Sequence, residues 1–130
     1  MSGPAPGRAR DLAGAAAATL AVAVLLLVPI PPPPAGAGGW WSALHVDKLA
    51  HLLVFLALGW IWRRSLARAG RPVSYLAIFA AVVAYGGLLE LLQAATGIRS
   101  AEWADFAADA LGAGLVPFWR GAPARNEPPA

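Results

Sequence analysis

Four apolar stretches divide the chain, and short clusters of charged residues separate them. The first stretch, Leu12 to Ile30, has 19 residues without a charge, and at about 1.5 Å per residue it is long enough to cross a hydrocarbon core about 30 Å thick. The others run from Val46 to Trp62, from Val73 to Ala95 and from Ala104 to Trp119, and each contains acidic residues. Their Leu, Ala, Val and Gly show little strict alternation, which favours helices over the strands of a barrel. The pattern predicts an all-α, polytopic membrane protein, a bundle of four transmembrane helices over 12–30, 46–62, 73–95 and 104–119.

The first stretch has a second interpretation, a cleaved secretory signal. Arg8 and Arg10 precede it, a run of prolines from Pro31 to Pro34 follows it, and Ala35 to Ala37 resembles a small-residue cleavage site. The apolar run is longer than a usual signal core. We therefore favour a retained helix and keep the signal as the alternative.

The placement of Lys and Arg predicts the orientation, because cytoplasmic loops carry an excess of both. Only Lys48 and Arg99 fall in the loops on one side. The other eight basic residues share the opposite side: Arg8, Arg10, Arg63, Arg64, Arg68, Arg71, Arg120 and Arg125. We therefore expect both termini to be cytoplasmic, with a short segment over 1–11, a membrane domain over 12–119 and a tail over 120–130. The six tryptophans fall near predicted helix ends, as interfacial anchors do: Trp40, Trp41, Trp60, Trp62, Trp103 and Trp119.

Composition supports the membrane assignment and excludes several other classes of protein. The chain is 58% hydrophobic and only 13% charged, which argues against disorder and against a soluble domain. The absence of cysteine excludes disulfides, Cys-containing zinc sites and thiol catalysis. A net charge of +3 does not indicate nucleic-acid binding, because no basic run with interleaved aromatic residues occurs. No Gly-rich nucleotide-binding motif is present either.

Three of the four predicted helices carry polar residues on one face near the same end. In the second predicted helix, helical spacing puts Asp47, Lys48 and His51 on the same face as Phe55 and Leu58. In the third, it puts Glu90 and Gln93 on the same face as Gly86, and in the fourth it puts Asp105 and Asp109 on the same face as Gly112 and Val116. His51, Glu90 and Asp109 each lie five residues from the predicted outer end of their helix, or about 7 to 8 Å deep. Charges at that depth are costly when they face lipid. We therefore expect the three stripes to face inward and meet in one polar layer.

The charge balance of this outer side is negative. Lys48 and Arg99 oppose Asp47, Glu90, Glu102, Asp105 and Asp109, which leaves −3, whereas the inner side carries +6. Arg99 is placed to cap the carboxylates. An excess of buried carboxylate over base implies that a proton or a cation is bound in the layer.

The chemistry of the layer has several interpretations. In one interpretation the polar residues only fix helix packing, as such groups do in many bundles. Glu90 and Asp109, with His51, are the candidates for acid and base catalysis, yet no nucleophile or oxyanion arrangement is visible. His51, Glu90, Asp105 and Asp109 are suitable ligands for a divalent ion, but no pair has a metal-binding spacing. The sequence therefore predicts neither a metal nor another cofactor, and His45 is read as an interfacial residue.

The ordered polar residues resemble the VanZ-like family of small bacterial membrane proteins, named for teicoplanin resistance. The resemblance covers roughly residues 45–116 and rests on an ordered set of short motifs: Asp47-Lys48-x-x-His51 with Phe55 and Gly59, Glu90-x-x-Gln93, Arg99, and Asp105-x-x-x-Asp109-x-x-Gly112. By the same resemblance, the polar cluster or ligand-binding positions are Asp47, Lys48, His51, Glu90, Gln93, Arg99, Asp105 and Asp109. At Asp109 the family usually has Asn.

The resemblance implies an integral protein of the bacterial inner membrane that contacts membrane lipids and acts in the cell envelope. It is linked in some members to reduced sensitivity to teicoplanin, and it implies no known reaction. One alternative is an intramembrane enzyme that acts on a lipid headgroup or a lipid-linked envelope precursor. Another is a scaffold or small subunit of a membrane complex. The oligomeric state does not follow from the sequence.

Overall fold

The computed structural model describes residues 6–29, 46–71, 73–97 and 102–119, and all regular structure within these ranges is helical. The helices are α1 (Pro6–Leu27), α3 (Val46–Arg68), α4 (Tyr75–Thr96) and α5 (Trp103–Leu115), and a short 3-10 helix, η1 (Val116–Phe118), follows α5. The predicted all-α class is confirmed for these residues. The connector over 31–39, the tail over 120–130, and Trp40, Trp41, His45 and Arg99 lie outside the described residues.

Three helices are long and apolar enough to cross a membrane: α1 from Gly7, α3 and α4. α5 has 13 residues and is therefore about 20 Å long, shorter than the hydrocarbon core of a bilayer. It ends early because Pro117 has no amide hydrogen to continue the helical ladder. The fourth crossing predicted over 104–119 therefore remains a prediction.

The other helix boundaries also differ from the predicted ones, for local reasons. α1 begins at Pro6 rather than Leu12, since proline is well suited to the first helical position. It ends at Leu27, two residues before Pro29. α3 continues beyond Trp62 to Arg68, because arginine is a good helix former and its long side chain can reach the membrane surface.

Caps delimit α4 at both ends. The Ser74 hydroxyl oxygen accepts a hydrogen bond from the Ala77 amide at 3.2 Å, and this bond satisfies a donor of the first turn. Gly97 closes the helix in the left-handed conformation with φ 68°, which glycine adopts without steric cost. α4 therefore ends at Thr96, and the next helix, α5, begins at Trp103.

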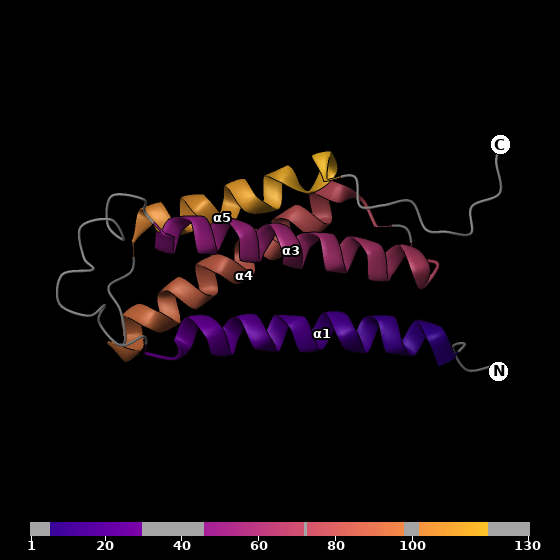
Figure 1. Ribbon diagram of the computed structural model, residues 1–130, viewed down its shortest axis with the longest axis horizontal. Helices are drawn as coiled ribbons and strands as arrows, with labels where there is room; N and C mark the ends of the chain where they lie inside the picture. The colour runs from indigo at the N-terminus through magenta and orange to yellow at the C-terminus, as the bar shows by residue number, and fades with distance from the viewer. Residues whose placement is uncertain (1–5, 30–45, 72, 98–101, 120–130) are drawn as a thin grey trace.

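α3 lies at the centre of the bundle (Figure 1). α1 and α5 pack on opposite sides of it, and α4 crosses behind and contacts α3, α5 and α1. α3 and α5 begin at the same end of the bundle, where α1 and α4 finish. The acidic first turns of α3 and α5 are therefore brought together, whereas Arg63, Arg64 and Arg68 lie toward the other end of α3.

The burial pattern is the reverse of that in a soluble protein. Apolar side chains such as Leu20, Leu76 and Leu91 are exposed, whereas Asp105 and Asp109 are only 2% and 1% exposed. The apolar core is formed by Val22, Leu26, Phe55, Leu58, Ile78, Val82, Leu89 and Ala113. An apolar exterior around buried charges matches a hydrocarbon solvent, which supports a membrane protein.

Candidate functional site

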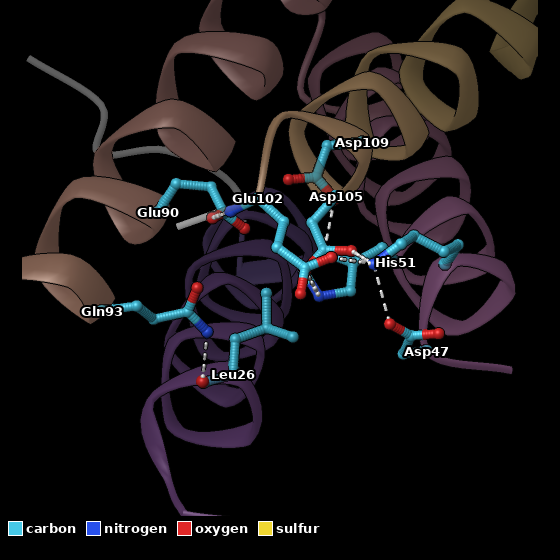
Figure 2. A network of polar contacts seen from close by, with 9 residues as sticks. Leu26, Asp47, His51, Glu90, Gln93, Glu102, Asp105 and Asp109 are labelled. Carbon is cyan, nitrogen blue, oxygen red and sulfur yellow. Dashed lines mark hydrogen bonds and ion pairs between the residues drawn. The ribbon is translucent and has the colours of Figure 1, made fainter. Parts of the chain in front are cut away.

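The predicted polar layer is a network between α3, α4 and α5 at the end of the bundle where α3 and α5 begin (Figure 2). Most residues of the predicted faces are buried: His51, Phe55 and Leu58 on α3, Gly86, Glu90 and Gln93 on α4, Asp105, Asp109 and Gly112 on α5, and Val116 on η1. Asp47 and Lys48, predicted on the same α3 face, are partly buried. The network has two adjoining parts, one around Lys48 and one around His51.

Lys48 binds three carboxylates. Its ammonium nitrogen lies 2.6 Å from Asp105 Oδ1, 2.6 Å from Glu102 Oε2 and 2.8 Å from Asp47 Oδ2. An ammonium group has three donors, so these contacts use all of them. The carboxylate of Asp105 is buried, whereas those of Asp47 and Glu102 are partly exposed. Lys48 thus links the first turn of α3 to the beginning of α5 and neutralises part of the acidic cluster.

His51 lies deeper on α3 and contacts the second aspartate of α5. Its Nδ1 is 2.8 Å from Asp109 Oδ1, and its Nε2 is 4.0 Å from Asp105 Oδ2. All three side chains are at most 3% exposed. Among the described residues, His51 Nε2 is the buried side-chain polar atom without a hydrogen-bond partner.

Glu90 brings α4 into the same cluster. Its Oε2 accepts a hydrogen bond from the Glu102 backbone amide at 3.2 Å, and the residue is 7% exposed. Glu90, His51 and Asp105 each have a ligating atom within 4.8 Å of the others. Three carboxylates and one imidazole are therefore concentrated in the buried part of the network, with Lys48 at its edge.

Two glycines allow this approach of the helices. An added Cβ at Gly112 would overlap the carbonyl oxygen of Leu52, so glycine permits α5 to lie directly against the backbone of α3. An added Cβ at Gly86 would lie 2.8 Å from Asp109 Oδ2 and 2.9 Å from the Phe55 ring. The small residues therefore determine how closely the buried pair of His51 and Asp109 is enclosed.

Gln93 lies apart from the cluster, although it belongs to the predicted set. Its amide nitrogen donates a hydrogen bond to the carbonyl oxygen of Leu26 at 2.7 Å, which connects α4 to α1. Two further bonds secure α1: the Tyr85 hydroxyl donates to the Thr19 carbonyl at 2.6 Å, and the Trp62 indole donates to the Thr19 hydroxyl at 2.9 Å. Trp62, predicted as an interfacial anchor, therefore also holds α1 in place.

Sequence reasoning counted Glu102 among the outer charges but did not assign it to the site. The structure gives it two contacts, since its carboxylate binds Lys48 and its amide binds Glu90. The available signal was its position three residues before Asp105, which puts Glu102 at the N-cap and Asp105 in the first turn of the same helix. Arg99, predicted to cap the carboxylates, lies outside the described residues.

An apolar groove of about 730 Å³ lies between α4 and α5. Its apolar lining includes Phe79, Val83, Leu91 and Phe106, and two acidic residues of the network, Glu90 and Glu102, also line it. The apolar groove thus reaches the polar cluster at Glu90 and Glu102. This shape can accommodate a hydrocarbon chain with a polar group beside the carboxylates.

No protein-family model matches the chain, and no curated protein or solved structure matches it either. The resemblance to the VanZ-like family therefore stays a prediction that rests on the ordered polar residues.

Proposed function

We propose that this chain is a VanZ-like integral protein of the bacterial cytoplasmic membrane that acts in the cell envelope, with its polar cluster facing the outer leaflet. The observation that carries the proposal is the buried network itself. Three helices bring residues of the three short motifs together: Lys48 and His51 from α3, Glu90 from α4, and Asp105 and Asp109 from α5. Burying so many charges in an apolar bundle is costly, and this supports a specific role for them.

The distribution of charge supports the proposed orientation. Arg10, Arg64 and Arg68 line one region of the bundle, and the acidic network lies toward the opposite end of α3. Basic residues favour the cytoplasmic side. We propose that α5, extended by η1, completes the fourth crossing by packing against α3, so that the chain ends on the side where it begins.

A deletion strain tests the proposal. We expect loss of the protein to change the sensitivity to teicoplanin or the composition of envelope lipids, and the full chain to restore both. Complementation with Asp105→Asn or Glu90→Gln is expected to fail, whereas Asp11→Asn, which alters an acidic residue near Arg68, is expected to succeed. An unchanged deletion strain would count against a role in the envelope.

A second candidate is favoured by the groove beside Glu90 and Glu102. In this proposal the protein binds a lipid or lipid-linked envelope precursor, with the apolar chain between α4 and α5, and acts on its headgroup. Glu90, Asp109 and His51 are the groups able to exchange protons there. If folded Glu90→Gln and Asp109→Asn variants fully restore both the lipid profile and the drug sensitivity, this catalytic role is excluded.

A further inference from the structure

Three buried side chains from three different helices form an arrangement suited to a metal ion. His51 on α3, Glu90 on α4 and Asp105 on α5 each have one ligating atom within 4.8 Å of the other two. Ligands of one ion at about 2.1 Å lie no more than about 4.2 Å apart. Movements of less than about one ångström would therefore place all three around a common centre. The sequence contains no metal-binding motif for such a site, because the three ligands lie on separate helices.

The two ring nitrogens of His51 have different environments. Nδ1 is 2.8 Å from the Asp109 carboxylate, and a carboxylate accepts hydrogen bonds, so in the neutral imidazole Nδ1 carries the proton and donates it. Nε2 then presents a lone pair. It is buried and has no hydrogen-bond partner among the described residues, and it lies on the side of Asp105 Oδ2. Histidines that bind metals are usually oriented in this way, with the second nitrogen donating to a carboxylate, a backbone carbonyl or water.

The two carboxylates are also held in place by the protein. Glu90 Oε2 accepts the amide hydrogen of Glu102, and Asp105 Oδ1 binds the Lys48 ammonium group. Such contacts orient a ligand before the ion arrives, which lowers the entropy lost on binding. Asp109 and Glu102 therefore serve as positioning residues.

The charge of the network favours a cation at this position. Five carboxylates, those of Asp47, Glu90, Glu102, Asp105 and Asp109, accompany Lys48 among the described residues. With neutral His51 this leaves a charge of −4, and counting Arg99 from the sequence leaves −3. Another acidic trio, Asp47, Glu102 and Asp105, also has closely spaced ligands, but the Lys48 ammonium group already contacts all three. The ion is therefore expected on the His51 side.

We propose that His51 Nε2, Glu90 and Asp105 bind one divalent transition-metal ion. One imidazole and two carboxylates suit Zn²⁺ or Mn²⁺ better than Mg²⁺, which prefers oxygen ligands alone. Three protein ligands leave a coordination position for water or an anionic group, as in catalytic sites. Because Glu90 also lines the groove, a phosphate of a lipid seated there can approach that position. The metal site itself does not depend on the VanZ-like assignment.

Metal binding to the full chain in phosphatidylcholine nanodiscs tests the proposal. The protein is treated with a chelator, incubated with Zn²⁺ or Mn²⁺ alone, and separated from free ion before its metal content is measured. We expect saturable binding of one ion per chain. Glu90→Gln and His51→Gln should weaken binding at least about 10-fold, and Asp109→Asn should weaken it by about 10-fold through the orientation of His51. Asp11→Asn is the matched control and should bind like the wild type, whereas Asp47→Asn, on the Lys48 side of the network, should lose much less affinity than Glu90→Gln.

Electron paramagnetic resonance of the Mn²⁺-loaded wild type gives a readout that needs no variant. We expect coupling of the ion to one imidazole nitrogen. Absence of saturable binding, or saturable binding without nitrogen coupling, would overturn the proposal. Equal losses in Asp47→Asn and Glu90→Gln would also overturn it, because they would place the ion on the Lys48 side. None of these results depends on the phenotype of the deletion strain, so the two proposals can fail separately.

Discussion

His51 Nδ1 lies 2.8 Å from Asp109 Oδ1, and this buried contact joins the second turn of α3 to the middle of α5. The Asp109 carboxylate faces the backbone of α4 at Gly86, where a Cβ would come within 2.8 Å of Oδ2. The pair is therefore enclosed by three helices. Its geometry depends on a hydrogen bond between two of them and on a glycine of the third.

Substitutions at Asp109 separate the hydrogen bond from the charge. Asp109→Ala leaves His51 Nδ1 without its acceptor in a buried position, and we expect the free energy of unfolding to fall by about 2 kcal/mol. Asp109→Asn keeps an oxygen acceptor of the same shape and should lose less than about 1 kcal/mol. Unfolding in mixed micelles, followed by circular dichroism, measures both. Equal losses would mean that the hydrogen bond does not stabilise the bundle.

Gly112 is expected to tolerate no side chain. In Gly112→Ala the new methyl group would overlap the Leu52 carbonyl oxygen, and backbone atoms cannot rotate away as a flexible side chain can. We expect a loss of about 1 to 3 kcal/mol in the free energy of unfolding. Gly114→Ala is the control on the same helix, because its Cβ would lie 3.8 Å from the Phe79 ring, an ordinary contact. That variant should be neutral or stabilised by up to about 1 kcal/mol, and a similar loss in both would refute the close-approach explanation.

Removing Lys48 is expected to be more damaging than removing an exposed basic residue. Lys48→Met leaves the buried Asp105 carboxylate without its ammonium partner, and we expect a loss of about 3 kcal/mol. Adding Asp105→Asn should recover part of the loss, because the buried charge that has lost its ammonium partner is then removed. Arg68→Ala provides the comparison, since its contact with Asp11 at 3.4 Å is partly exposed and should contribute less than about 1 kcal/mol. A double-mutant cycle with no coupling between positions 48 and 105 would contradict this interpretation.

Periodicity predicted the faces of the helices but not the partners of the side chains. Helical spacing puts Asp105, Asp109 and Gly112 on one face, and all three are buried, because each face is a local property of one helix. The sequence does not show that His51 contacts Asp109 or that Gln93 binds the carbonyl of Leu26. Those contacts depend on how far one helix is shifted along another. Close packing at Gly112 sets part of that shift, and only the folded bundle reveals it.

Helix ends were predicted less well where charged residues continue a helix or where a proline interrupts an apolar run. Arg63 and Arg64 read as a loop because they are charged, yet they belong to α3, since the helix can emerge from the membrane without ending. Pro117 has the opposite effect, because it ends α5 inside an apolar run. Hydropathy reports the solvent around a segment, whereas the helix ends where its backbone hydrogen bonds end.

α1 is expected to remain in the mature protein. Gln93, Tyr85 and Trp62 donate hydrogen bonds to Leu26 and Thr19 of this helix, and its loss would leave these buried or half-buried donors without partners. Each such bond contributes about 1 kcal/mol. The intact mass of protein extracted from membranes should therefore include residues 6–27. A mature chain beginning after Ala37 would instead favour the cleaved signal.

Cysteine labelling tests the orientation directly, because the chain has no cysteine of its own. Ala67 is exposed in the last turn of α3, close in sequence to Arg64 and Arg68, and the predicted topology places it in the cytoplasm. Position 100 belongs to the predicted outer segment. In intact cells, a membrane-impermeant thiol reagent should label Ser100→Cys but not Ala67→Cys, and permeabilised cells should show labelling of both. Labelling of position 67 but not position 100 in intact cells would show that the orientation is the reverse of the proposed one. The network of Lys48 and His51 would then lie on the cytoplasmic side, and this would exclude a function in the outer leaflet.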